Sequence, residues 1–144
     1  MTTQSVIPHL VVADAKAALA FYAKALGAEI VMSVPEEKGT RLLHAEMLVL
    51  GSRIYLRDDF PEYCTGKDGD VRAPAGATPV VIHLEVPDCD AATNRAREAG
   101  ARVAMEPWDA FWGARYAQIV DPFGHAWSFA HPLPQNTANT PAGA

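Results

Sequence analysis

The sequence repeats itself once, and this repeat constrains the fold more than any other feature. The segment HLVVAD at residues 9–14 resembles HLEVPD at residues 83–88, which lies 74 residues later. Glycines that follow the two copies also recur, each pair 73 residues apart: Gly27 with Gly100, and Gly51 with Gly124. Three matches in the same order indicate an internal duplication with one single-residue deletion, so the chain consists of two copies of one structural unit.

Each copy predicts a strand, a helix and three further strands. In both copies an aspartate follows the first strand and can cap a helix, and a glycine follows the alanine-rich stretch and can end it. The turn Asp-Pro-Phe-Gly at residues 121–124 has the residue preferences of a type I turn. The predicted strands combine apolar and β-branched residues: 7–12, 29–34, 41–50 and 53–57 in the first copy, and 80–86, 102–105, 115–120 and 125–130 in the second.

A chain of 144 residues makes about one ordinary domain. We expect a single domain over residues 1–131, with module one at 5–58, a connecting loop at 59–78 and module two at 79–131. The connecting loop is rich in glycine, proline and charge, as connectors and binding loops are. Residues 132–144 are polar and without pattern, which predicts a disordered tail.

The composition excludes several classes of protein. Twelve basic against 17 acidic side chains give a net charge of −5, which disfavours nucleic acid as a partner. There is neither an apolar run near the roughly 20 residues that span a bilayer nor a signal segment, so we expect no membrane partner. Cys64 and Cys89 form no CxxC pair, which disfavours a disulfide framework or zinc site and makes the reducing cytoplasm the expected location.

The two βαβββ copies and the turn before the last strand resemble the vicinal oxygen chelate superfamily, which includes glyoxalase I, bleomycin-resistance proteins and extradiol dioxygenases. The finer resemblance is to its PhnB-like branch. It implies an α+β fold in which two tandem βαβββ modules form a cup-shaped, eight-stranded mixed sheet around a pocket, usually completed as a homodimer. The segments that carry the resemblance are IPHLVV (7–12), FY (21–22), LGAE (26–29), HAE (44–46), FWGARY (111–116) and DPFGHAWS (121–128).

Metal-dependent members of this superfamily take ligands from the first and fourth strands of each module. Aligned on the repeat, those positions hold Ile7 and Tyr55 in module one and Val81 and Ser128 in module two. Isoleucine and valine cannot bind a metal, and tyrosine and serine are poor ligands without help. We therefore expect no metal at the superfamily's positions, no cofactor and no glyoxalase I activity, and whether the chain is an enzyme at all stays open.

A displaced metal site is the alternative. His9 and His83 each lie two residues past a lost ligand, so strand periodicity leaves them on the same sheet face. Glu85 lies two residues further along that face, and Glu46 could face inward from a neighbouring strand. Two histidines and a carboxylate could bind a divalent metal, although strand histidines more often line a pocket.

Aromatic residues concentrate near the end of the chain, where all three tryptophans lie between positions 108 and 127. Aromatic faces bind planar ligands by stacking, and an arginine can add a charge or a cation–π contact. Trp127 and Phe129 are expected in the core. The residues expected to bind a ligand are His9, Tyr55, His83, Trp112, Arg115 and Tyr116.

Three functions follow from these observations. The first is a cytoplasmic, homodimeric small-molecule-binding protein without the superfamily's metal site. The second is a metal-dependent lyase, isomerase or dioxygenase-type enzyme that uses the displaced His9/His83 site. The third is a structural or regulatory dimer with a vestigial pocket. Serine nucleophile chemistry gains little support, because Ser128 would need His9 or His83 beside it as a base.

Overall fold

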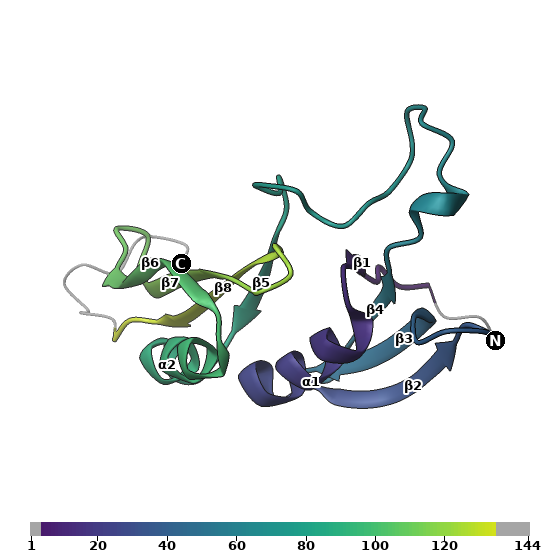
Figure 1. The fold of residues 1–144 in the computed structure, drawn as a ribbon. Helices are drawn as coiled ribbons and strands as arrows, with labels where there is room; N and C mark the ends of the chain where they lie inside the picture. Colours follow the sequence, from purple (N-terminus) through teal and green to yellow (C-terminus); the bar gives the residue numbers. More distant parts are fainter. Residues whose placement is uncertain (1–3, 135–144) are drawn as a thin grey trace.

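The computed structural model describes residues 4–134, and these form two α-helices, eight strands and one short 3-10 helix (Figure 1). Module one consists of β1 (His9–Val12), α1 (Ala15–Leu26), β2 (Glu29–Pro35), β3 (Leu42–Val49) and β4 (Ser52–Asp58). The connecting segment contains η1 (Pro61–Tyr63). Module two consists of β5 (Val81–Glu85), α2 (Cys89–Ala99), β6 (Arg102–Asp109), β7 (Ala114–Val120) and β8 (Ala126–Pro132).

The two helices begin and end at the residues that the repeat marks. The Asp14 carboxylate accepts a hydrogen bond from the Ala17 N–H at the start of α1, and the Asp88 carboxylate accepts one from the Ala91 N–H at the start of α2. Each bond satisfies a backbone donor that has no partner within the helix. Gly27 ends α1 in the left-handed conformation at φ 68°, which a residue without Cβ adopts at low cost.

The predicted fold class is confirmed, and the eight strands are divided between two four-stranded mixed sheets. Their strand orders are β1-β4-β3-β2 and β5-β8-β7-β6, so both modules have the same topology. In each sheet the first strand is an edge strand, and it pairs in parallel with the module's last strand. The modules contact each other through α1 and α2, and the β1 and β5 edges are not joined by pairing within the described residues.

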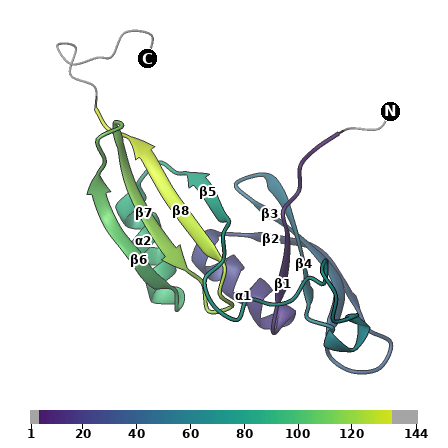
Figure 2. The same ribbon diagram turned by 90° about the horizontal axis from the view of Figure 1, so that it is seen from above.

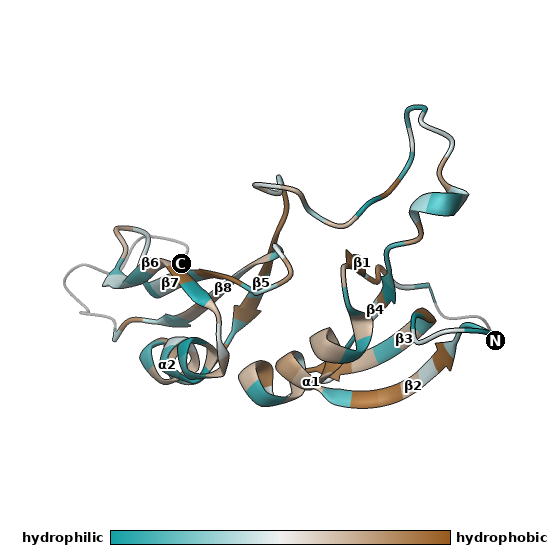
Figure 3. Cartoon of the chain, viewed as in Figure 1, coloured by the Kyte–Doolittle hydropathy of each residue, from teal (hydrophilic) through white to brown (hydrophobic). Residues whose placement is uncertain are grey.

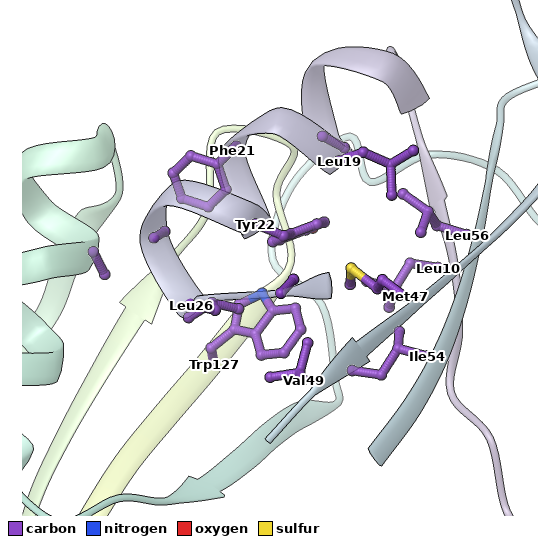
Figure 4. Packing of buried hydrophobic residues seen from close by; sticks show 14 of the residues in the cluster. Leu10, Leu19, Phe21, Tyr22, Leu26, Met47, Val49, Ile54, Leu56 and Trp127 are labelled. Atoms are coloured by element: carbon purple, nitrogen blue, oxygen red, sulfur yellow. The ribbon is translucent and has the colours of Figure 1, made fainter. Parts of the chain in front are cut away.

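One hydrophobic core holds the two modules together. Trp127 of β8 lies against Tyr22 of α1, with 5.3 Å between the ring centroids, so α1 packs on module two as well as on its own sheet (Figure 4). The Tyr22 hydroxyl donates to Oδ2 of buried Asp121 over 2.5 Å, and Trp127 Nε1 donates to the same oxygen over 2.8 Å. As predicted, Trp127 and Phe129 are core residues.

Each sheet has one face that carries the helices and one face that is left open. In β4, Ile54, Leu56 and Asp58 are buried, and the residues between them are not. Every residue of β2 is exposed, including a stretch of apolar side chains that is visible as brown ribbon in Figure 3. Figure 2 shows the two sheets splayed on either side of the helices. The open faces are therefore the surfaces on which a ligand or a second chain can bind.

The connecting segment is tied to both modules. Arg57 of β4 donates to the Val71 carbonyl oxygen of this segment over 3.4 Å, and Pro74 lies so close to Gly124 that a Cβ at this glycine would be 2.8 Å from the proline ring. Strand β8 continues to Pro132, one residue past the predicted end of module two. The rest of the predicted disordered tail, from residue 135, lies outside the described residues.

Candidate functional site

The open face of module one carries a row of polar side chains centred on Tyr55. In the strand register, His9 of β1 lies opposite Tyr55 of β4, Tyr55 lies opposite Glu46 of β3, and Glu46 lies opposite Met32 of β2. The rings of His9 and Tyr55 meet edge to face with 5.9 Å between their centroids. His9 therefore lies beside Tyr55, the residue at the fourth-strand position that the resemblance assigns to a metal ligand.

The open face of module two carries the equivalent row. His83 of β5 lies opposite Ser128 of β8, Ser128 opposite Gln118 of β7, and Gln118 opposite Met105 of β6. Comparison of the rows pairs His9 with His83, Tyr55 with Ser128, Glu46 with Gln118 and Met32 with Met105. The internal duplication is therefore preserved at the level of individual site positions.

A cleft of about 1030 Å³ lies between the two modules and contains part of the predicted site. Its volume is at the upper end of the range of roughly 300–1,000 Å³ that small-molecule pockets have. It is lined by residues of the chain before β1, of the β3–β4 hairpin and of β5, which include Ile7, Tyr55, His83 and Glu85. Within the described residues, the ring contacts of His9 stay in module one and those of His83 stay in module two.

The residues at the positions that the resemblance assigns to metal ligands do not fit a metal. Ile7 and Val81 have no donor atom, and the Ser128 hydroxyl is engaged with His83. The displaced candidates are divided between the modules, with His9 and Glu46 in module one and His83 and Glu85, which contact each other, in module two. Residues 4–134 contain no group of three or more His, Cys, Asp or Glu side chains that could hold a metal ion.

His83 is held in place from both of its ring nitrogens. Nδ1 lies 2.7 Å from Ser128 Oγ, and Nε2 lies 3.2 Å from Glu85 Oε2. The ring also stacks on Tyr116 with 6.0 Å between centroids and 13° between planes. Ser128 thus has beside it the histidine that a serine nucleophile would need as a base. Because Ser128 is only 1% exposed, however, the group that can meet a ligand is the imidazole of His83.

An aromatic corner continues the open face of module two. Trp112 meets Tyr116 edge to face at 5.6 Å, and Trp108 meets Trp112 at 5.8 Å. Trp108 is 39% exposed, Trp112 53% and Phe111 92%. So much exposed aromatic surface in one place is typical of interaction sites. The structure therefore brings together three of the predicted ligand-binding residues, namely His83, Trp112 and Tyr116.

Arg115 lies on the other side of the sheet. Its guanidinium forms a two-bond ion pair with Asp90 of α2, at 2.9 and 3.0 Å, and a further bond of 3.1 Å to Asp109. Both carboxylates hold the arginine against the helix side of β7, whereas its neighbour Tyr116 faces the open side. We therefore leave Arg115 out of the site, although it was expected to bind a ligand.

Three polar residues of module one join the site without having been expected there. His44 lies next to Tyr55, with 4.7 Å between ring centroids, and its Nε2 is 3.1 Å from Glu46 Oε2. Arg53 and Arg57 flank Tyr55 on β4 and alternate with buried residues, so both lie on the open face. Burial, the positive charge of Arg57 and the adjacent His44 lower the pKa of His9 below its ordinary value of 6.5.

Within residues 4–134, neither helix is long and apolar enough to cross a membrane.

Comparison with known proteins gives one family over most of the chain. The family described as "Glyoxalase/Bleomycin resistance protein/Dioxygenase superfamily" matches residues 5–129. The uncharacterized protein Mb0911c of Mycobacterium bovis is 45% identical over 126 residues, which cover 88% of this chain and 82% of that protein. Among solved structures, TioX from Micromonospora sp. ML1 is similar with a TM-score of 0.67 and 25% identity, covering 91% of this chain and 100% of that one. FosX from Listeria monocytogenes, a fosfomycin resistance protein crystallised with Mn(II) and sulfate, has the same fold at a TM-score of 0.67 and 17% identity, covering 96% of this chain and 100% of that one.

Proposed function

The chain belongs to the glyoxalase/bleomycin resistance protein/dioxygenase superfamily, and from this premise we propose that it binds a small molecule without the superfamily's metal. The observation that carries the proposal is the pair of equivalent rows on the two open faces, in which Tyr55 and Ser128 stand at ligand positions. Each row supplies hydrogen-bonding groups and an imidazole in place of metal ligands. Such groups fix the orientation of a ligand, as polar residues do in mostly apolar pockets.

The ligand is held between a polar floor and the aromatic corner. Trp108, Trp112 and Tyr116 offer ring faces and edges to a flat or apolar part of the ligand. His83, fixed by Ser128 and Glu85, presents its imidazole ring at the foot of these rings. A binding role also agrees with the donor geometry, since residues 4–134 contain no group of three or more His, Cys, Asp or Glu side chains that could hold a metal ion.

A second copy of the chain completes the site in this proposal. The helices hold the modules together inside one chain, so the open face of each sheet is left without a cover. Ile30, Val31 and Met32 on β2 are 41–53% exposed, which leaves apolar surface for a partner. In the homodimer, module one of one copy faces module two of the other, so that the His9 row and the His83 row line a single cup.

Subunit mixing tests both parts of the proposal. A thermal-shift screen of small aromatic compounds first identifies one that stabilises the protein. Trp112→Ala and His9→Ala should each abolish that stabilisation, while Lys24→Ala, on the exposed side of α1, should keep it. Because a mixed dimer of the first two variants contains one cup with both residues intact, mixing them after mild unfolding should restore binding at about a quarter of the sites of wild type. The proposal is refuted if no compound binds, and the shared cup is refuted if mixing restores nothing.

A second candidate function is catalysis by a displaced site, which the fixed orientation of His83 favours. An imidazole held between a hydroxyl and a carboxylate can accept or deliver a proton, and it can also ligate a divalent ion. A metal-dependent lyase, isomerase or dioxygenase-type enzyme would use His83 together with His9. Titration of the protein with Zn²⁺, Ni²⁺ and Mn²⁺ distinguishes this candidate, since binding that His83→Gln removes would favour it over metal-free binding.

The proposal also includes the branch of the superfamily and the cellular compartment to which the chain belongs. The segments FWGARY at 111–116 and DPFGHAWS at 121–128 support the PhnB-like branch of the superfamily. The two cysteines lie apart, at positions 64 and 89, which supports a reducing compartment such as the cytoplasm.

A further inference from the structure

The open face of module one carries positive charge, although the chain as a whole is negatively charged. The protein as a whole carries a net charge of −5. On this face, however, Arg53 and Arg57 stand two residues either side of Tyr55, and Glu46 is the carboxylate that faces them from β3. Asp59 also lies near Arg57, but this carboxylate is paired with Arg72 over 2.8 Å. Three guanidinium groups therefore meet two carboxylates, and two histidines lie beside Arg53 and Arg57.

The two carboxylates do not neutralise these arginines. Glu46 is shared between His44, at 3.1 Å, and Arg53, whose Nη1 is 3.7 Å away and whose side chain is 51% exposed. The donors of Arg57 are directed at backbone carbonyl oxygens, those of Asp58 at 3.0 Å and Val71 at 3.4 Å, and these carry no formal charge. The contrast is clear at Arg115, whose charge is matched by two aspartates.

The pKa of His9 agrees with the same positive potential. It is lowered first by burial, then by the positive charge of Arg57 and by the adjacent His44. Neutral imidazoles and a phenol hydroxyl can donate hydrogen bonds to an anion that the guanidinium groups attract. The groups converge, since His9, His44 and Tyr55 lie within 4.7–6.0 Å of one another, measured between ring centroids.

From this arrangement we infer that module one binds the oxyanion group of the ligand, a carboxylate or a phosphate, between Arg53 and Arg57. Tyr55 and His9 form the floor of this site and donate hydrogen bonds to the oxyanion. The inference rests on the proposed function and gives it a ligand class, namely a small organic anion. A net charge of −5 would by itself favour a cationic ligand, and the inference opposes that class.

Calorimetric titration with three probes tests the inference at pH 7 and constant ionic strength. The probes are sodium benzoate, sodium phosphate and benzylamine hydrochloride, which separate carboxylate, phosphate and cation. Saturable binding of benzoate or phosphate is expected, with benzylamine binding more weakly. Hydrogen bonds to charged groups are strong enough that Arg53→Gln and Arg57→Gln should each weaken anion binding by roughly tenfold or more.

Matched variants separate a local contact from general charge. Lys24→Gln, on α1, removes the same charge away from the site and should leave anion affinity unchanged. Arg57→Lys should keep part of the affinity, because the charge remains and the planar fork is lost. If Arg57→Gln does not fold, Arg53→Gln still tests the inference, because the Arg53 side chain is half exposed and its replacement should not prevent folding.

Three results overturn the inference: no binding of either anion, equal affinity in Arg53→Gln and Lys24→Gln, or tighter binding of benzylamine. The outcome of the compound screen decides separately whether the proposed small-molecule site is correct. If a neutral or cationic aromatic compound from the screen binds through Trp112 while both anions fail, the small-molecule site stands and the oxyanion class is wrong. If that screen fails as well, both proposals are wrong.

Discussion

The bond between Tyr22 and Asp121 provides a quantitative test of how the two modules are joined. Tyr22 is fully buried on α1, and its hydroxyl donates to a carboxylate of module two that is itself 4% exposed. Burial, the charge of Asp121 and this hydrogen bond raise the pKa of Tyr22 well above 10.0, so the phenol remains a donor at neutral pH. Tyr22→Phe removes the hydroxyl and keeps the ring that packs on Trp127.

The magnitude follows from the kind of bond that is lost. A hydrogen bond to a charged group contributes about 1.5–3 kcal/mol, and Asp121 keeps its bonds from Trp127 Nε1 and from the backbone N–H groups of Phe123 and His125. We therefore expect Tyr22→Phe to lower the free energy of unfolding by about 2 kcal/mol. Urea denaturation at fixed protein concentration measures this, with an unchanged m-value as evidence that the denatured state is the same.

Tyr63→Phe is the matched control, because Tyr63 is 75% exposed in the connecting segment. Its effect should stay within about 0.5 kcal/mol, as for surface substitutions generally. A double-mutant cycle with Asp121→Asn should also give a coupling energy above about 0.5 kcal/mol. A Tyr22→Phe loss no larger than that of the control would refute the view that this bond joins the modules.

Three further outcomes are expected. The pKa of His9 is lowered below 6.5, so the unfolded chain binds more protons than the folded chain as pH falls through this value. The free energy of unfolding should therefore be lower at pH 5.0 than at pH 7.5, and this decrease should be larger in wild type than in His9→Gln. Gly124→Ala should destabilise more than Gly51→Ala in urea denaturation, since both residues have positive φ but only the first would place a Cβ 2.8 Å from Pro74; equal losses would contradict the contact. Asp88→Ala should cost about 1 kcal/mol through the lost helix cap, and a calorimetric scan that shows no loss would exclude that role.

Much of the fold could be predicted because the duplication supplies the same information twice. The helix caps, the glycine that ends α1 and the strand order of each module repeat, so an uncertain boundary in one copy is supported by the other. Strand β6 was predicted to end at residue 105 but runs to Asp109. Register shifts within its pairing with β7 obscure the alternation of side chains, and Pro107 weakens a strand signal.

The site was predictable where it depended on one strand and not where it depended on pairing. His9 and His83 were placed by periodicity alone, whereas the Ser128–His83 contact needs the parallel register of β5 with β8. Some missed features had a signal in the sequence. Adjacent strand residues face opposite sides, so Arg115 and Tyr116 could not both line one face, and His44 must share the face of Glu46 two residues later.

The metal content of the protein tests the central claim most directly. Protein expressed in rich medium and purified without chelators should contain well below one equivalent of zinc, nickel, iron and manganese per chain by inductively coupled plasma mass spectrometry, because Ile7 and Val81 offer no donor at the superfamily's ligand positions. One equivalent of a single metal that survives dialysis, and that His9→Ala or His83→Ala releases, would contradict the account and identify the chain as a metalloprotein.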